Sequence, residues 1–143
     1  MKTQQLSIFL ENKPGTLEHA IKAMSDVNVN IRAMSLADTE DFGILRLIAN
    51  SNDAAINALQ NAGFIVQLTD VVAVEVPDRP GGLYGILSLL SQKEINTEYA
   101  YAFIARSSDK AVTIFRFTQT DKAIRLLIEK GVSIIPGEQL YSM

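Results

Sequence analysis

Residues 6–17 read Leu-Ser-Ile-Phe-Leu-Glu-Asn-Lys-Pro-Gly-Thr-Leu, and residues 72–83 read Val-Ala-Val-Glu-Val-Pro-Asp-Arg-Pro-Gly-Gly-Leu. In both stretches buried-type apolar residues recur at every second position, which predicts a strand with one buried face. A Pro-Gly pair then ends the strand, and apolar residues at helical spacing follow it. The chain therefore contains the same strand, turn and helix start twice, 66 residues apart.

The repeat extends over nearly the whole chain. The offset of 66 residues continues without a gap to Asn30 and Asn96, and becomes 68 or 70 after a longer loop in the second copy. Each copy has about 70 residues, which is small for an independent domain, so we expect domains over residues 1–69 and 70–143 that bury surface against each other. Only Thr69 and Asp70 separate the copies, and the absence of a Gly-, Ser- or Pro-rich linker predicts one rigid body.

Each copy is predicted to fold in the order strand, helix, strand, strand, helix, strand. This α+β arrangement is ferredoxin-like, with two helices on one face of an antiparallel sheet. Gly63 and Gly131 are expected at left-handed helix ends. We expect hairpin loops at residues 38–43 and 105–109, and fourth strands at residues 64–66 and 132–135.

Composition excludes several classes of function. The 143 residues are 48% hydrophobic and 20% charged, with a formal net charge of −3, which suits a folded chain without a nucleic-acid partner. The absence of cysteine excludes disulfides, Cys-ligated zinc, iron–sulfur clusters and thiol catalysis, and His19 as the one histidine excludes a two-histidine metal site within one chain. No apolar run approaches the roughly 18 residues of a membrane span, so we expect a soluble cytoplasmic protein.

The segment Glu11-Asn12-Lys13-Pro14-Gly15-Thr16-Leu17, followed by Val29-Asn30-Ile31, resembles the ACT domain family. The segment Asp78-Arg79-Pro80-Gly81-Gly82-Leu83, followed by Ile95-Asn96, resembles it again, so the resemblance covers essentially the whole chain. It implies a tandem pair of regulatory modules. Such modules mostly bind amino acids, in the crevice between two ACT domains that pair through their sheets or helices.

The resemblance also implies which residues bind the effector. The loop after the first strand forms one wall, and the start of a partner's second strand forms the other. By position, the walls are Asn12, Lys13, Pro14, Gly15, Thr16, Leu17 and Asn30 in the first copy, and Asp78, Arg79, Pro80, Gly81, Gly82, Leu83 and Asn96 in the second.

The first copy is the favoured site because it keeps both asparagines. Asn12 and Asn30 match a serine-responsive form of the family, although Leu10 stands where that form has a histidine, which argues against serine itself. In the second copy Asp78 would repel a carboxylate. The glycine lets a ligand approach the backbone, the helix start suits a carboxylate, and an asparagine amide both donates and accepts.

Simpler interpretations exist for these residues. The Pro-Gly pairs also suit plain turns, and Asn30 and Asn96 also suit strand edges or turns. His19 lies opposite the apolar stripe of its helix and is expected to be an exposed surface residue. Arg46 and Arg116 suit either burial between sheets or contact with a ligand. One further motif is an aromatic row with period two, for which core or interface packing is favoured over RNA stacking: Tyr99, Tyr101 and Phe103.

Three functions are compatible with this composition. The favoured one is a non-catalytic amino-acid sensor without a cofactor, because the chain has no G-x-S-x-G or Walker motif and no evident acid–base pair. The second is a constitutive regulatory subunit of an amino-acid-metabolism enzyme. The opening Leu10-Glu11-Asn12 resembles the small subunit of acetolactate synthase, but the repeat of the D-R-P-G pattern argues against it. The third, an enzyme such as a mutase, lacks a credible constellation of acid and base and would have to work with carboxylates, lysines or tyrosines.

A homodimer is expected as well. The third strand of the first copy carries apolar residues on both faces, with Leu45 and Leu47 on one face and Ile44 and Ile48 on the other. A sheet with one face in water would alternate with polar residues.

Overall fold

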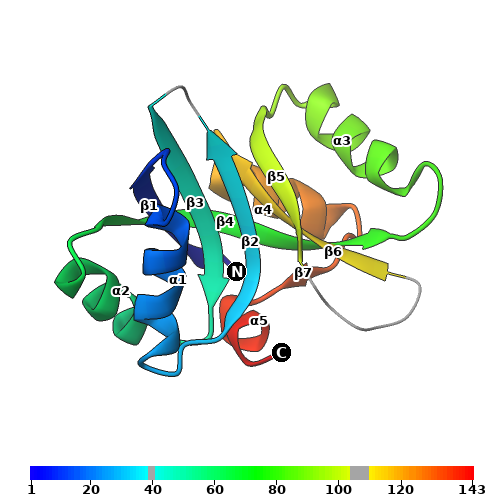
Figure 1. Ribbon diagram of the computed structural model, residues 1–143. Helices are drawn as coiled ribbons and strands as arrows, with labels where there is room; N and C mark the ends of the chain where they lie inside the picture. Colours follow the sequence, from blue (N-terminus) through cyan, green and yellow to red (C-terminus); the bar gives the residue numbers. More distant parts are fainter. Residues whose placement is uncertain (39–40, 104–109) are drawn as a thin grey trace. The chain divides into compact units, whose positions relative to one another are not determined.

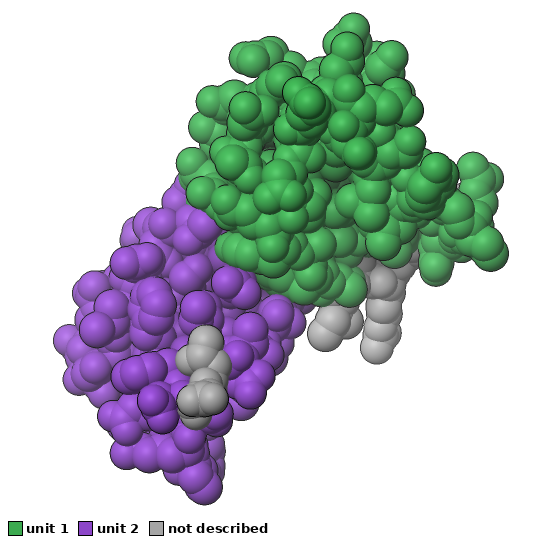
Figure 2. All heavy atoms as spheres, turned by 90° about the horizontal axis from the view of Figure 1, so that it is seen from above, with its two compact units in different colours: residues 1–3, 70–143 green, residues 4–69 purple. Residues whose placement is uncertain are grey.

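The computed structural model describes residues 1–38, 41–103 and 110–143. The chain divides into two compact units, which Figure 2 colours separately. Unit 2 comprises residues 4–69, and unit 1 comprises residues 1–3 and 70–143. The division falls within strand β4 (Ile65–Pro77), so this one strand supplies residues to both units.

Unit 2 contains the first copy of the repeat. Its elements are β1 (Thr3–Glu11), α1 (Thr16–Ser25), β2 (Ile31–Asp38), β3 (Phe42–Ala49), α2 (Asn52–Asn61) and the first part of β4 (Figure 1). The strand order is β2-β3-β1-β4, with β1–β3 and β2–β3 antiparallel. Helices α1 and α2 contact each other and pack on one face of this sheet. This is the βαββαβ order of a ferredoxin-like unit.

Unit 1 contains the second copy. It takes the rest of β4 and adds α3 (Gly82–Gln92), β5 (Thr97–Phe103), β6 (Lys110–Phe117), α4 (Thr120–Glu129), β7 (Ile134–Ile135) and α5 (Gly137–Ser142). The strand order is β7-β4-β6-β5, which reproduces the order in unit 2. The predicted α+β class and the two ferredoxin-like units are therefore confirmed.

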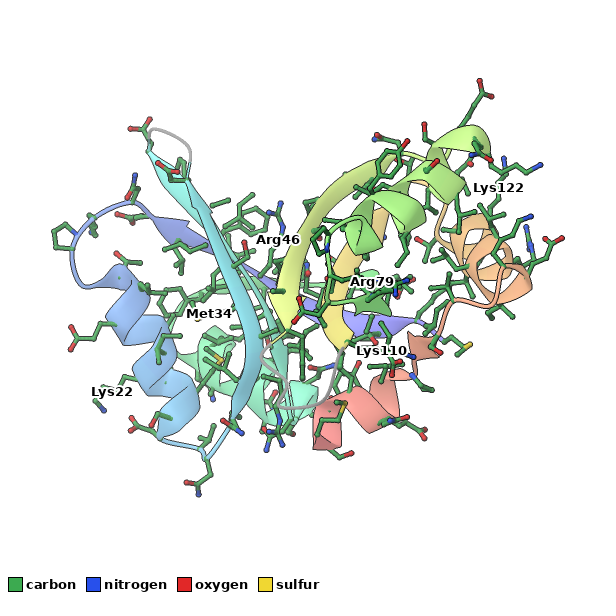
Figure 3. The ribbon with its side chains drawn as sticks, turned by 90° about the vertical axis from the view of Figure 1, so that its right-hand side faces the viewer. Lys22, Met34, Arg46, Arg79, Lys110 and Lys122 are labelled. Carbon is green, nitrogen blue, oxygen red and sulfur yellow. The ribbon has the colours of Figure 1, made fainter. Side chains whose placement is uncertain are left out.

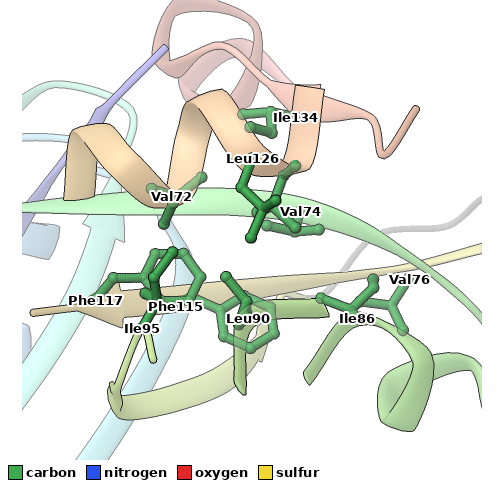
Figure 4. Packing of buried hydrophobic residues seen from close by; sticks show 12 residues of the cluster. Val72, Val74, Val76, Ile86, Leu90, Ile95, Phe115, Phe117, Leu126 and Ile134 are labelled. Carbon is green, nitrogen blue, oxygen red and sulfur yellow. The ribbon is translucent and has the colours of Figure 1, made fainter. Parts of the chain in front are cut away.

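Each unit has its own apolar core under its two helices. In unit 2 the alternating residues Leu6, Ile8 and Leu10 of β1 are buried, as the period of two predicts. In unit 1 Phe115 and Phe117 stack with ring centroids 5.3 Å apart. Figure 4 shows this second core, whose labelled members include Val72, Val74, Val76, Ile86, Leu90, Ile95, Leu126 and Ile134.

The two copies also share irregular features. The β2–β3 pairing shifts register between Ile31 and Ala33, and the β5–β6 pairing shifts between Thr97 and Tyr99. Gly63 and Gly131 end helices α2 and α4 with φ of 92° and 76°, which confirms the predicted left-handed conformation. The two copies thus share these backbone features although many of their side chains differ.

The fourth strands differ from the prediction. Thr69 and Asp70 do not separate two strands, because β4 runs through them without a break. The second fourth strand is only Ile134–Ile135, since Pro136 has no N–H for the ladder, and helix α5 follows it without having been predicted. The predicted first hairpin loop is shorter, because Asp38 pairs with Gly43 in the β2–β3 ladder. The second, residues 105–109, lies outside the described residues.

The N-terminal residues 1–3 belong to unit 1. The Lys2 ammonium is 3.0 Å from the Asp121 carboxylate and 4.0 Å from that of Asp70. The hydrogen bond that Lys2 donates to the Asp121 carboxylate, together with the attraction of that charge, raises the pKa of Lys2 above 10.5. Across residues 1–38, 41–103 and 110–143, no helix has both the length and the apolar character needed to cross a membrane.

Candidate functional site

The two Pro-Gly loops have the same backbone conformation. Gly15 precedes α1 with φ 88° and ψ −16°, and Gly81 precedes α3 with φ 87° and ψ −11°. A Cβ built on either glycine would meet no atom within 4 Å, so the left-handed φ, rather than crowding, requires glycine there. Both loops therefore present an open backbone at the start of a helix.

The helix starts offer donors for an anion. The N–H of Thr16 donates to the Lys13 carbonyl at 3.4 Å, and the N–H of His19 donates to the Gly15 carbonyl at 3.0 Å. The N–H groups between these two belong to the first turn, which has no preceding turn to accept them. Together with the helix dipole they favour a carboxylate or another anion.

The candidate Gly82 also has a structural role that the sequence did not indicate. A Cβ on Gly82 would lie 2.0 Å from the carbonyl oxygen of Pro77, so glycine is needed there because two backbone segments approach each other. Thr16 occupies the equivalent position in unit 2. The two loops thus differ locally despite their equal glycine conformations.

Asn30 and Asn96 join the start of one strand to the end of the next. The N–H of Asn30 donates to Oδ1 of Asn50 at 2.9 Å, and the Asn30 carbonyl accepts the N–H of Asn50 at 3.0 Å. The Asn96 carbonyl accepts the N–H of Thr118 at 3.1 Å, and its Nδ2 is 3.5 Å from Oγ1 of Thr118. Both asparagines are exposed and have this structural role in addition to any ligand contact.

Within unit 2 the two predicted walls lie at opposite ends of β2. The N–H of Asn12 donates to the Asp41 carbonyl at 2.9 Å, beside the β2 end where Asp38 pairs with Gly43. Asn30 precedes the other end of β2 (Figure 1). Eight residues of strand span about 27 Å, so one small ligand cannot contact both asparagines of the same unit. The same topology separates the loop at residues 78–83 from Asn96 in unit 1.

A pocket of about 560 Å³ lies beside the loop of unit 2. It lies between this loop, the start of β3 and the turn from α2 to β4. Its charged rim is formed by Glu11 and Lys13, whose Oε2 and Nζ atoms are 2.9 Å apart. The rest of the wall comprises Phe9, Leu10, Pro14, Gly15, Thr16, His19, Phe42, Ala62, Gly63, Phe64 and Ile65. A smaller pocket of about 140 Å³ on the same loop includes Asn12, Lys13 and Leu17.

Unit 1 has the corresponding pocket, of about 380 Å³, beside its own loop. Phe42 pairs with Glu11 across the strands, as Lys110 pairs with Pro77, so the two walls correspond by register. Here the wall is charged, because Lys110 and Glu75 form an ion pair at 3.4 Å. Figure 3 labels Lys110 together with Arg79 of the loop. The remaining candidates Asp78, Pro80 and Leu83 line a separate hollow of about 430 Å³.

Most residues of the unit 2 pocket wall were not identified from the sequence. His19 is exposed as predicted, but its ring also meets Phe64 edge-on, with centroids 5.3 Å apart. The repeat alignment pairs Phe9 with Glu75, which is a change from aromatic to acidic at one position. That difference was visible in the sequence and signals that the two copies have diverged beside the loop.

The two arginines left open by the sequence lie on sheet strands. Nη1 of Arg116 donates to the Asp70 carbonyl at 2.7 Å, and Nε is 3.4 Å from the Glu98 carboxylate. Arg116 thus fixes β6 to its neighbours. Arg46, labelled in Figure 3, pairs in register with Ser7 and Ser35. The aromatic row lies on the strand face that does not contribute to the unit 1 core, opposite Arg116, Ile114 and Val112 on β6.

Within the part of the chain that the structure describes, no three His, Cys, Asp or Glu side chains gather in a way that could hold a metal ion. No curated protein sequence matches the chain. Protein BT0572 from Bacteroides thetaiotaomicron has a similar crystal structure. It is 38% identical, with a TM-score of 0.93, and the match covers 100% of this chain and 98% of that protein.

Two more distant structures share the fold. The regulatory subunit of aspartate kinase from Thermus thermophilus, in its ligand-free form, is 14% identical with a TM-score of 0.60 over 88% of this chain and 90% of that subunit. The corresponding subunit from Thermus flavus is 12% identical with a TM-score of 0.56 over 90% and 92%. The family model described as ACT domain pair matches residues 1–143. The chain therefore belongs to the ACT domain pair family, whose members are ligand-binding regulatory modules.

Proposed function

We propose that this chain is a non-catalytic regulatory protein that binds a free amino acid between ACT units of two copies of the chain. The observation that carries the proposal is the open, left-handed Gly15 loop ahead of α1 in a chain of this family. The first N–H groups of α1 suit the α-carboxylate of an amino acid. The amide of Asn12 on the same loop suits its polar groups, since an amide both donates and accepts.

The second wall of the site comes from another copy of the chain. Asn30 cannot meet the loop of its own unit because β2 separates them. Strand β2 is an edge strand, and within the described residues no strand pairs with its outer edge. Met34 and Leu36 on this strand are exposed, as expected of a strand that another copy covers. A homodimer thus brings Asn30 of one copy to the Asn12 loop of the other.

Ligand binding by the purified chain tests the proposal. A thermal-shift screen of the twenty amino acids is expected to raise the melting temperature with a small subset, and light scattering to report a dimer. Calorimetry on Asn12→Ala and Asn30→Ala is expected to show about tenfold to hundredfold weaker binding, since each removes a hydrogen bond to a charged ligand. Asn96→Ala is the matched control. Normal binding by both Asn12→Ala and Asn30→Ala would overturn the assigned site. A monomer in solution would overturn a site shared between two copies of the chain.

The regulatory subunits of aspartate kinase among the similar structures favour a second candidate. In this alternative the chain is a constitutive regulatory subunit of an amino-acid-metabolism enzyme and acts by protein contact. The same screen separates the two functions. A sensor binds its amino acid alone, whereas a constitutive subunit shows no thermal shift with any of the twenty.

A further inference from the structure

The pockets beside the two Pro-Gly loops occupy equivalent places but differ in chemistry. In unit 2 the walls at Phe9 and Phe42 are aromatic. In unit 1 the same two places hold Glu75 and Lys110, which pair with each other at 3.4 Å. The fold alone requires neither wall, because both units keep the same strand order around their pockets.

We propose that the unit 2 pocket receives the effector's side chain, and that the effector is an amino acid with a large apolar or aromatic side chain. This inference rests on the proposed function and specifies its ligand class. The volume of about 560 Å³ falls in the range of small-molecule sites, roughly 300–1,000 Å³. The unit 1 pocket takes no such ligand, because its charged pair would lose water without gaining a polar partner.

The apolar wall explains the choice of side chain. Phe9 is 38% exposed, Phe42 56% and Ile65 66%, so three large apolar residues of one small region face water. A ligand that covers them removes apolar surface from water, which is favourable in proportion to the area covered. Phe64, held edge-on by His19, completes an aromatic wall that suits a ring in offset or edge-to-face packing.

The polar rim explains why the ligand is an amino acid rather than a plain hydrocarbon. The Glu11 carboxylate and the Lys13 ammonium lie 2.9 Å apart on the pocket wall, both exposed. An amino acid carries its ammonium and its carboxylate on one carbon, so its ammonium faces Glu11 while its carboxylate lies at the first N–H groups of α1, beside Lys13. In unit 1 Pro77 stands in place of Glu11, so this rim position has no carboxylate there, and the carboxylate of that pocket, Glu75, is paired with Lys110.

Calorimetry with L-phenylalanine, L-leucine and L-serine tests the inference on the intact chain. We expect L-phenylalanine or L-leucine to bind about 10- to 100-fold more tightly than L-serine, with one ligand per chain. The double variant F9E/F42K transplants the ion pair of unit 1 into unit 2 and is expected to abolish this binding. Ile65→Ser, which copies Ser133 at an exposed position, is expected to weaken binding several-fold. Ser133→Ile in unit 1 is its matched control and is expected to bind as the wild type does.

Each other outcome counts against a definite part of the reasoning. Tightest binding of L-serine or of a charged amino acid overturns the inference and leaves the proposed function standing. Unchanged L-phenylalanine binding by folded F9E/F42K and by Ile65→Ser overturns it as well. If F9E/F42K turns a dimer into a monomer that still binds, the patch is an interface between copies and not a ligand pocket. If no amino acid binds at all, the proposed function fails, and the inference fails with it.

Discussion

Replacing Gly82 by alanine is expected to destabilise the protein by about 3 kcal/mol, at the upper end of ordinary overpacking. The added Cβ would lie 2.0 Å from the Pro77 carbonyl oxygen and 3.0 Å from its carbon. Both contacts are with backbone atoms, so a side-chain rotamer change cannot relieve them. The start of α3 must therefore move away from Pro77 by about 1 Å, which disturbs the close packing around it.

Gly85 provides a matched control one turn later in the same helix. A Cβ on Gly85 would meet no atom within 4 Å, so Gly85→Ala is expected to stabilise the chain by about 0.5–1 kcal/mol through helix propensity. Urea unfolding followed by far-ultraviolet circular dichroism measures both variants. Their free energies of unfolding are expected to differ by about 4 kcal/mol. Equal stability of Gly82→Ala and Gly85→Ala would show that the close approach to Pro77 does not constrain the loop.

Three further predictions concern single contacts. Asn50→Ala removes the side-chain acceptor of the Asn30 N–H, an exposed hydrogen bond, and is expected to lower the free energy of unfolding by about 0.5–1 kcal/mol in urea. Arg116→Met removes a 2.7 Å bond to a β4 carbonyl and is expected to cost about 1.5 kcal/mol by the same assay, while an unchanged value would mean that the bond is replaced by water. The raised pKa of Lys2 means that its pairing with Asp121 adds stability below pH 10.5, which is lost as pH rises through the folded-state value. Lys2→Met should therefore abolish this alkaline part of the stability–pH profile, and an unaltered profile would contradict it.

The local pattern predicted the elements whose partners are close in sequence. Alternation in residues 6–10 indicated β1, and the Pro-Gly pair indicated its end, because strand burial and left-handed turns depend on the residues themselves. The polar Thr69 and Asp70 suggested a break, yet β4 continues through them. Their partners are distant: Oγ1 of Thr69 lies 3.2 Å from Oγ of Ser7, and the Asp70 carbonyl accepts Arg116. No window along the sequence contains such contacts.

Helix α5 was not predicted either, because it too depends on contacts that are distant in the sequence. It has six residues, too few to be stable by propensity alone, and Leu140 anchors it with its side chain fully buried. Tertiary packing therefore decides whether this helix forms. The candidate site shows the same division. The Pro-Gly motif predicted the Gly15 loop from the sequence. The aromatic wall combines residues from β1, β3 and the α2–β4 turn, which only the folded sheet places together.

A comparison of the two units separates residues that maintain the fold from the residues that we propose select a ligand. Three pairs that keep their residue type between copies fix the backbone: Pro14 and Pro80, Gly15 and Gly81, Gly63 and Gly131. The positions that change include the pocket wall, where aromatic and apolar residues of unit 2 correspond to charged or small ones in unit 1. Because the loop is kept and the wall is replaced, our proposal assigns an anion-binding helix start to both units but a side-chain pocket to unit 2 alone, so that unit 2 distinguishes one amino acid from another by its apolar bulk.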